Sequence, residues 1–147
     1  MIKVPQTVID FIRSHAENAY PEECCGMILG VQLDGTRSVH QANAIDNAQT
    51  DDRHRRFLIS PEQYLDAEKT ARGRNLDLLG FYHSHPDHPA APSQFDAEHA
   101  LPWFSYIILS VLNARSEKIT SWRLSEDRAG FEEENIYVES HERKVEP

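Results

Sequence analysis

The chain has 147 residues, of which 39% are hydrophobic and 27% are charged, and its formal net charge is −9. This length suits one compact domain with its own core. The acidic balance argues against nucleic-acid binding, which depends on clustered lysine and arginine. The adjacent Cys24 and Cys25 are the only cysteines. A disulfide framework and a cysteine-based zinc site are therefore both excluded.

No segment of the sequence resembles a signal peptide or a membrane span. The first residues, MIKVPQ, hold one lysine and lack an apolar region. The most apolar run, Tyr106–Leu112, is far too short to cross a bilayer. We therefore expect a cytoplasmic protein with reduced thiols and no membrane partner.

The N-terminal part of the sequence predicts one helix among short strands. Pro5 suits the first position of a helix, and Val8, Phe11 and Ile12 place apolar side chains on one side of it. Asp34–Gly35 is a hairpin signal, so the strands on its two sides should pair antiparallel. The expected elements are a strand at Ile2–Val4, a helix from Pro5 to about Asn18, and strands at Cys24–Val31 and Thr36–Ala44.

The C-terminal part predicts two more helices and several strands. Residues 47–56 are polar and should form a loop, and Ser60 with Pro61 begins a helix that should end near Gly73. The other expected elements are strands at Phe57–Ile59 and Leu76–Ser84, a short helix at Ser93–Ala100, and strands at Tyr106–Leu112, Lys118–Leu124 and Phe131–Val138. This alternation predicts an α/β fold, a mixed sheet with helices on its faces. We expect one domain over residues 1–140 and a charged tail over 141–147.

The stretch GFYHSHPDHPAAPSQFD, residues 80–96, carries the densest cluster of reactive side chains. Side chains two apart on a strand point to the same face, so His83 and His85 should project together from the strand end. Pro86 should stop the strand just past them. Two imidazoles on one rigid edge make half of a zinc site, because a catalytic zinc takes three protein ligands and a water.

Asp96 is the natural third ligand, since the stiff PDHPAAP loop could return the next helix beneath the histidines. Locally, Ser93 and Asp96 also fit a helix N-cap with an acidic residue three positions on. Ser93 could serve as both cap and site residue, whereas we expect the Asp96 carboxylate to serve only one role. A zinc hydrolase also needs a carboxylate base, and Glu22 and Glu23 precede the strand at Cys24–Val31. Their position alone does not choose between them or exclude a solvated acidic pair.

The order HSHP, six residues and SxxD, from His83 to Asp96, resembles the signature of the JAMM (MPN-domain) metallopeptidases. The segment Glu23–Gly26 matches the ExCG that accompanies this signature in the family. The Gly-x-Tyr before HSHP and the strand that starts at Ser105 also resemble compact bacterial members. The similarity extends from about residue 3 to residue 125 or beyond, nearly the whole chain.

This resemblance implies a role for each matching residue. The zinc ligands would be His83, His85 and Asp96. Glu23 would act as general base and then general acid, and Ser93 would help to hold the oxyanion of the tetrahedral intermediate. Ser84 points to the other face and is expected to pack. The implied fold is an α/β sandwich similar to that of cytidine deaminases, although their HxE and PCxxC motifs are absent here.

Members of this family hydrolyse peptide or isopeptide bonds just after the C-terminal Gly-Gly of ubiquitin-like proteins. The compact bacterial ones often process sulfur-carrier proteins of that fold. The resemblance therefore implies a zinc-dependent (Zn²⁺) peptidase whose partner is a Gly-Gly-tailed sulfur carrier. The segments Asn47–Phe57 and Ser105–Leu109 should line its cleft, and Arg55 or Arg56 either pairs with the tail or is solvated. The alternatives are a non-catalytic MPN scaffold, which usually lacks a ligand, and a related metal-dependent hydrolase.

Several remaining residues are expected to carry no chemistry. His88 is assigned to the loop surface, Trp103 and Phe104 to the core or the cleft wall, and Cys25 to the core. Glu132–Glu134 is expected to be a solvated edge. The histidines placed on polar faces or in loops are His15, His40, His54, His99 and His141.

Overall fold

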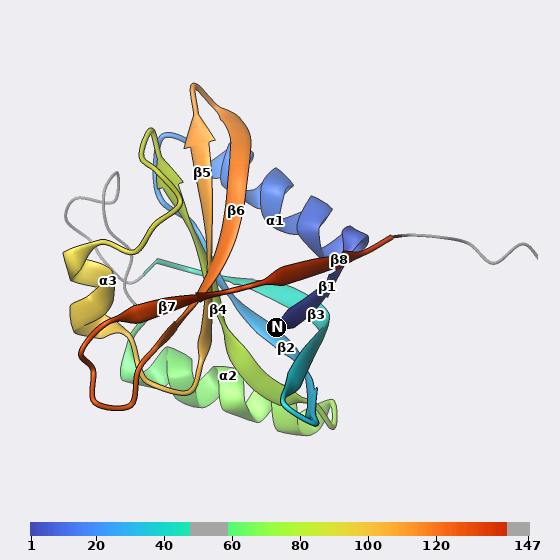
Figure 1. Ribbon diagram of the computed structural model, residues 1–147. Helices are drawn as coiled ribbons and strands as arrows, with labels where there is room; N and C mark the ends of the chain where they lie inside the picture. The colour runs from blue at the N-terminus through green and yellow to red at the C-terminus, as the bar shows by residue number, and fades with distance from the viewer. Residues whose placement is uncertain (48–58, 141–147) are drawn as a thin grey trace, which may run out of the picture.

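Eight strands in the described part of the chain form one mixed sheet, which dominates the fold (Figure 1). The computed structural model describes residues 1–47 and 59–140. Along the sheet the strands follow the order β7-β6-β5-β4-β2-β3-β1-β8. The strands are β1 Ile2–Pro5, β2 Cys25–Leu33, β3 Thr36–Ile45, β4 Asp77–Pro86, β5 Ser105–Leu112, β6 Arg115–Leu124, β7 Phe131–Glu134 and β8 Ile136–Glu139.

The sheet curves round into a near-barrel because its two end strands are consecutive in the chain. β7 pairs antiparallel with β6, whereas β8 pairs parallel with β1, and only Asn135 separates the two. The single strand expected at Phe131–Val138 is therefore wrong, since the segment changes partner at Asn135. The strand expected at Phe57–Ile59 is not found at Ile59, and its other residues lie outside the described ranges.

Helices α1 (Gln6–Ala19) and α2 (Pro61–Gly73) lie on different sides of this sheet (Figure 1). The apolar stripe of α1 contains Val8, Ile9, Ile12 and Ala16. Phe11 is 42% exposed, so its expected place on the buried side is wrong. It falls at the margin of a stripe that centres on the other four residues.

Helix α2 begins as its sequence predicts. The Oγ of Ser60 accepts a hydrogen bond from the N–H of Gln63, and the Oε1 of Gln63 accepts one from the N–H of Ser60. Pro61 occupies the first turn, where its missing N–H is not needed. The buried face of the helix carries Ala67 and Ala71, which join an apolar cluster around Phe81 of β4.

The central strand β4, which carries His83 and His85, is held in place by its two neighbouring strands. It pairs antiparallel with β2 and parallel with β5. Every residue from Leu78 to Pro86 is buried, so the strand is held on both faces. At Gly80 an added Cβ would lie 1.8 Å from the carbonyl oxygen of Ser105, so β5 can approach closely only because this residue is glycine.

A buried arginine of β3, which the sequence did not predict, links that strand to the first residues of β4 and β5. Arg37 has no exposed surface. Its guanidinium donates to the Leu79 carbonyl at 3.1 Å, to the Ser105 hydroxyl at 2.9 Å and to the Trp103 carbonyl. It also lies 4.3 Å from the centre of the Trp103 ring. Burial lowers the pKa of Arg37 to about 10, and a guanidinium remains charged at that value.

Two expectations are corrected beside Arg37. Trp103 is 49% exposed, so it does not belong to the core. Glu134 is not a solvated edge residue, because its side chain is 9% exposed and its Oε2 accepts hydrogen bonds from Ser105 and Ser121. Both residues serve Arg37. A buried guanidinium needs carbonyl acceptors and a nearby carboxylate, and the Trp103 carbonyl and Glu134 supply them.

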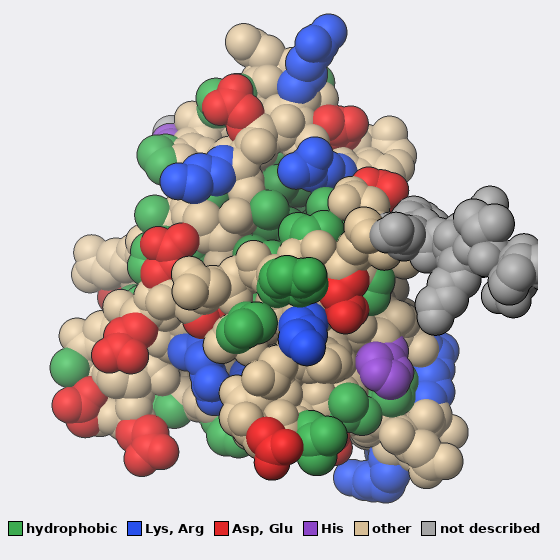
Figure 2. Space-filling view, turned by 45° about the vertical axis from the view of Figure 1, so that its right-hand side comes forward, with side chains coloured by type: hydrophobic (Ala, Val, Ile, Leu, Met, Phe, Trp, Pro, Cys, Tyr) green, Lys and Arg blue, Asp and Glu red, His purple; other side chains and the backbone are tan. Residues whose placement is uncertain are grey.

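The described surface mixes charges and presents no membrane-spanning helix. Figure 2 shows acidic and basic side chains interspersed over one face. Within the ranges described, no helix is both long enough and apolar enough to cross a membrane.

Candidate metal centre

Strand β4 brings two imidazoles together inside the protein, as the motif predicts. His83 and His85 are 1% and 6% exposed. Their Nε2 atoms are 3.0 Å apart. The parallel register places them opposite Ile108 and Ser110 of β5, so all four side chains share one face of the sheet.

Asp96 supplies the third donor from helix α3 (Gln94–His99). Its Oδ2 lies 3.3 Å from the Nε2 of His83 and 3.2 Å from the Nε2 of His85. A tetrahedral zinc with bonds of about 2.0–2.1 Å needs ligand atoms roughly 3.3 Å apart. The three donors therefore fit such an ion closely, and in the described residues they form the cluster capable of holding a metal.

Asp96 forms the helix cap, and the same carboxylate oxygen also faces both histidines, so the cap does not prevent the proposed ligand role. The Oγ of Ser93 accepts a hydrogen bond from the N–H of Asp96 at 3.1 Å, and the Oδ2 of Asp96 accepts one from the N–H of Ser93 at 2.9 Å. A carboxylate oxygen has more than one lone pair, so Oδ2 can accept from Ser93 and still face the histidines.

The charge states of this cluster suit metal binding. Burial disfavours the charged carboxylate of Asp96, but His83 and His85 beside it and the N–H of Ser93 outweigh burial, so the pKa of Asp96 is lowered. Burial also lowers the pKa of His83, although Asp96 opposes this shift. At neutral pH the site therefore offers a carboxylate and a neutral imidazole, the forms that bind metals.

A backbone carbonyl orients the second imidazole. The Nδ1 of His85 lies 2.8 Å from the carbonyl oxygen of Pro89. When Nδ1–H donates to this carbonyl, the Nε2 keeps its lone pair for a metal. The proline-rich loop thus fixes the ring of His85 and returns the chain to Asp96, which the sequence predicted only in part.

The two candidate catalytic residues share one groove, here called the Glu23 groove, lined by Glu23, His85, His88, Pro89, Ala91 and Ser93. Glu23 is 6% exposed, whereas Glu22 is exposed. The structure therefore favours Glu23 over Glu22 as a base that works next to the histidines. His88 is exposed, as expected for the loop surface.

Two hydrogen-bonded links fasten the segment that carries Glu23 to the segment that carries the histidines. The Oγ of Ser84 accepts from the N–H of Cys24 at 2.9 Å. The hydroxyl of Tyr20 donates to Asp87 Oδ2 at 2.6 Å. The packing role expected for Ser84 is thus incomplete, because its hydroxyl anchors the backbone next to Glu23. The spacing in sequence gave no signal for either long-range link.

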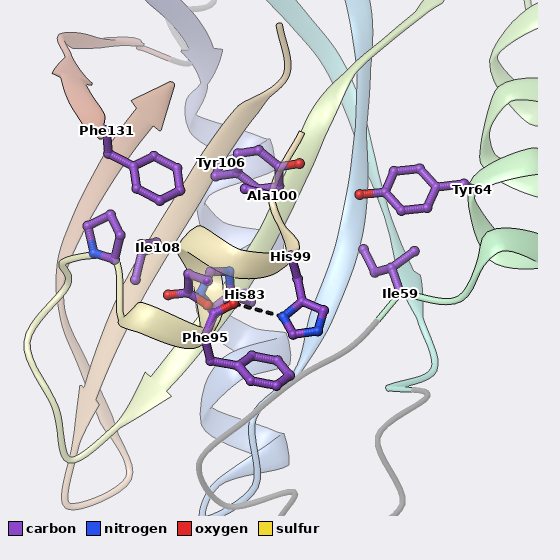
Figure 3. A pocket seen from close by; sticks show the side chains of 11 residues that line it. Ile59, Tyr64, His83, Phe95, His99, Ala100, Tyr106, Ile108 and Phe131 are labelled. Carbon is purple, nitrogen blue, oxygen red and sulfur yellow. Dashed lines mark hydrogen bonds and ion pairs between the residues drawn. The ribbon is translucent and has the colours of Figure 1, made fainter. Parts of the chain in front are cut away.

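His83 and Asp96 border an apolar cavity, here called the aromatic cavity, which shares no lining residue with the Glu23 groove (Figure 3). Its volume is about 60 Å³. Tyr106 and Ile108 of β5 line it. That the segment Ser105–Leu109 lines a substrate cleft stays a prediction. Arg55, Arg56 and most of Asn47–Phe57 lie outside the described residues.

The cysteines and the remaining histidines named from the sequence differ in burial and in the groups that they contact. Cys24 and Cys25 are buried, and burial raises their pKa values to about 11 and about 12. His15 is half-buried rather than on a polar face, with its Nδ1 2.7 Å from the hydroxyl of Tyr82. His99 borders the aromatic cavity. His54 and His141 are not among the described residues.

Known proteins resemble the chain over most of its length. Residues 5–125 match the family described as prokaryotic homologs of the JAB domain. The desampylase of Haloferax volcanii is 32% identical over 106 residues, covering 69% of this chain and 74% of that protein. A probable TtuB-protein conjugate cleaving protease of Thermus thermophilus is 28% identical over 116 residues, covering 79% and 74%. A solution structure from Desulfitobacterium hafniense matches with a TM-score of 0.82 at 31% identity, covering 96% of this chain and 94% of that one.

These findings confirm several expectations drawn from the motif. The resemblance to the JAMM (MPN-domain) metallopeptidases is confirmed, as are the single α/β domain of that family and the expectation of a JAMM-type hydrolase. The match covers both the segment of Glu23 and the whole span from His83 to Asp96. The chain therefore belongs to the prokaryotic homologs of the JAB domain.

Proposed function

We propose that this protein is a zinc-dependent peptidase or isopeptidase that hydrolyses the bond after the C-terminal Gly-Gly of a ubiquitin-like sulfur-carrier protein. The observation that carries the proposal is the convergence of His83, His85 and Asp96, with donor atoms 3.0–3.3 Å apart, beside a groove that contains Glu23 and Ser93. The names of the two relatives, a desampylase and a conjugate cleaving protease, support deconjugation as the class of reaction.

In this proposal His83, His85 and Asp96 would hold the zinc. A zinc bound there supplies Lewis acidity and lowers the pKa of a coordinated water towards ~7. Glu23 takes the proton of the attacking water and delivers it to the leaving nitrogen. Glu23 is 6% exposed and lines the same groove as His85, which suits this role.

Ser93 stabilises the negative charge that develops on the substrate carbonyl oxygen. Its Oγ already accepts a hydrogen bond from the N–H of Asp96, so its own hydrogen remains available to donate. A donor held by a helix cap needs little reorganisation when that charge develops. The same contact that begins α3 thus prepares Ser93 for catalysis.

Selectivity for two glycines follows from an extended tail lying in a narrow cleft beside the sheet. Side chains at either glycine would clash there, while the backbone of the tail can add hydrogen bonds along a strand edge. Tyr106 and Ile108, which line the aromatic cavity together with His83 and Asp96, would form one wall of such a cleft. Upstream side chains of the tail would enter the aromatic cavity.

The test is the intact mass of a Gly-Gly-ended sulfur carrier, extended by a few residues, after incubation with the protein. Trimming back to Gly-Gly that a chelator abolishes is expected. His85→Ala should lose both zinc and activity, because one of three ligands is gone. Glu23→Gln should keep one zinc per chain and lose about 10²–10⁴ in rate.

Other outcomes would refute parts of the proposal. A fully active Glu23→Gln enzyme would remove Glu23 from the mechanism. Zinc binding without cleavage of any extended or conjugated carrier would favour the scaffold alternative instead.

A further inference from the structure

A large groove outside the candidate metal site lies between the loop at residues 87–91 and the hairpin of β5 and β6. Its volume is about 540 Å³. We call it the β6 groove, because β6 contributes Glu117, Lys118, Thr120 and Trp122 to its wall. The hydroxyl of Thr120 donates to the carbonyl of Ala90 at 2.7 Å, which fixes the loop over the strand.

The β6 groove borders the Glu23 groove, and the loop at residues 88–91 contributes to both. His88, Pro89 and Ala91 line both of them. Ser110 in the β6 groove also lies opposite His85 in the β4–β5 register, on the same face of the sheet. A polypeptide held at the metal cluster could therefore continue directly into the β6 groove.

The chemistry of the proposed reaction decides which part of a substrate lies there. Hydrolysis breaks the bond between the last glycine carbonyl carbon and the leaving nitrogen, which must receive a proton. Glu23 delivers that proton, so the leaving nitrogen faces the Glu23 groove. The carrier tail then lies towards His83, Asp96 and the aromatic cavity.

The charges of the β6 groove favour one kind of leaving chain. Asp87, Glu117 and Glu133 line it, against a single Lys118. Asp87 already accepts hydrogen bonds from Tyr20 and Asn113, whereas no ion pair among the described residues engages Glu117 or Glu133. Trp122, half-buried in the wall, adds an aromatic ring that suits lysine or arginine.

We infer that the β6 groove binds the polypeptide on the leaving side of the scissile bond and prefers one with basic side chains. This inference rests on the proposed function and narrows its substrate class. A carrier joined to a basic peptide or protein segment is a better substrate than a carrier that ends in one added residue. A single added residue presents less chain to the β6 groove than a peptide does.

The experiment compares three carriers that differ only after Gly-Gly: one added residue, a five-residue lysine-containing peptide, and the same peptide with glutamate in place of lysine. The expected kcat/KM is about three- to tenfold higher for the basic peptide than for the acidic one at low salt, as for a few exposed charge pairs. This ratio should shrink in about 0.5 M NaCl, because salt screens such pairs.

A matched pair of double variants locates the effect. Glu117→Gln with Glu133→Gln should bring the ratio close to one. Glu68→Gln with Glu126→Gln removes the same charge from exposed positions elsewhere and should keep the wild-type ratio. Equal cleavage of both peptides, or a preference that survives the groove variant, would overturn the inference while the proposed function stands. Cleavage of none of the three carriers would overturn both.

Discussion

Replacing Ser84 by alanine tests whether the strand of the histidines holds Glu23, the proposed catalytic base, in place. Ser84 is 1% exposed, and its Oγ accepts a hydrogen bond of 2.9 Å from the N–H of Cys24. Alanine leaves that buried donor unsatisfied, which costs about 1–3 kcal/mol in the free energy of unfolding. For a chain of this size that corresponds to a fall in Tm of roughly 2–10 °C.

The effect on activity should exceed the effect on stability. Glu23 directly precedes Cys24, so a backbone shift on the order of 1 Å at this point moves the carboxylate, and such a displacement costs about 10²-fold in rate. Ser84→Ala should therefore lower kcat by about 10–100-fold with a smaller change in KM. The metal should stay bound, because His83, His85 and Asp96 are unchanged.

The assay combines urea unfolding, metal content per chain, and steady-state cleavage of the extended carrier. Ser121→Ala is the matched control, since Ser121 has no exposed surface and donates to Glu134 at 2.9 Å, away from the Glu23 groove. It should lose comparable stability and keep its kcat. If Ser84→Ala also kept the wild-type kcat, Ser84 would act only through packing.

Three further predictions concern the rest of the fold. Arg37→Ala should lower the free energy of unfolding by about 2–5 kcal/mol in urea, because buried carbonyls lose their donor, and an unchanged midpoint would contradict the role given to Arg37. Cys24 and Cys25, with pKa values raised to about 11 and about 12, should resist alkylation near pH 8 in the native protein and react in urea, as read by mass. Burial lowers the pKa of His15, so the unfolded chain binds its proton at a higher pH than the folded chain, and stability should fall as the pH drops below about 6.5. The slope of unfolding free energy between about pH 7.5 and 5.5 should be shallower in His15→Gln, and equal slopes would refute this assignment.

Much of the fold could be predicted because its signals are local. Ser60 and Pro61 specify the start of α2, and Asp34–Gly35 specifies the hairpin between β2 and β3. The candidate metal site was predictable for the same reason, since alternation along one strand places His83 and His85 on the same face.

What sequence reasoning missed depends on contacts between distant segments. Arg37 finds its acceptors 42 and 68 positions away, at Leu79 and Ser105. No local pattern distinguishes such an arginine from a solvated one. The change of partner at Asn135 likewise depends on where β1 and β6 lie, which is a property of the whole sheet.

The position of Asp96 shows why a helix cap and a proposed metal ligand are not competing explanations for one carboxylate. The cap places Ser93 N–H against Oδ2, and this bond helps to lower the pKa of Asp96 and to aim the oxygen at the two imidazoles. The return bond, from the N–H of Asp96 to the Oγ of Ser93, leaves the serine hydrogen free for the substrate. Formation of the first turn of α3 would therefore order the proposed ligand Asp96 and the proposed oxyanion donor Ser93 together. A local helix signal and a catalytic signal should coincide wherever a site is built on the start of a helix.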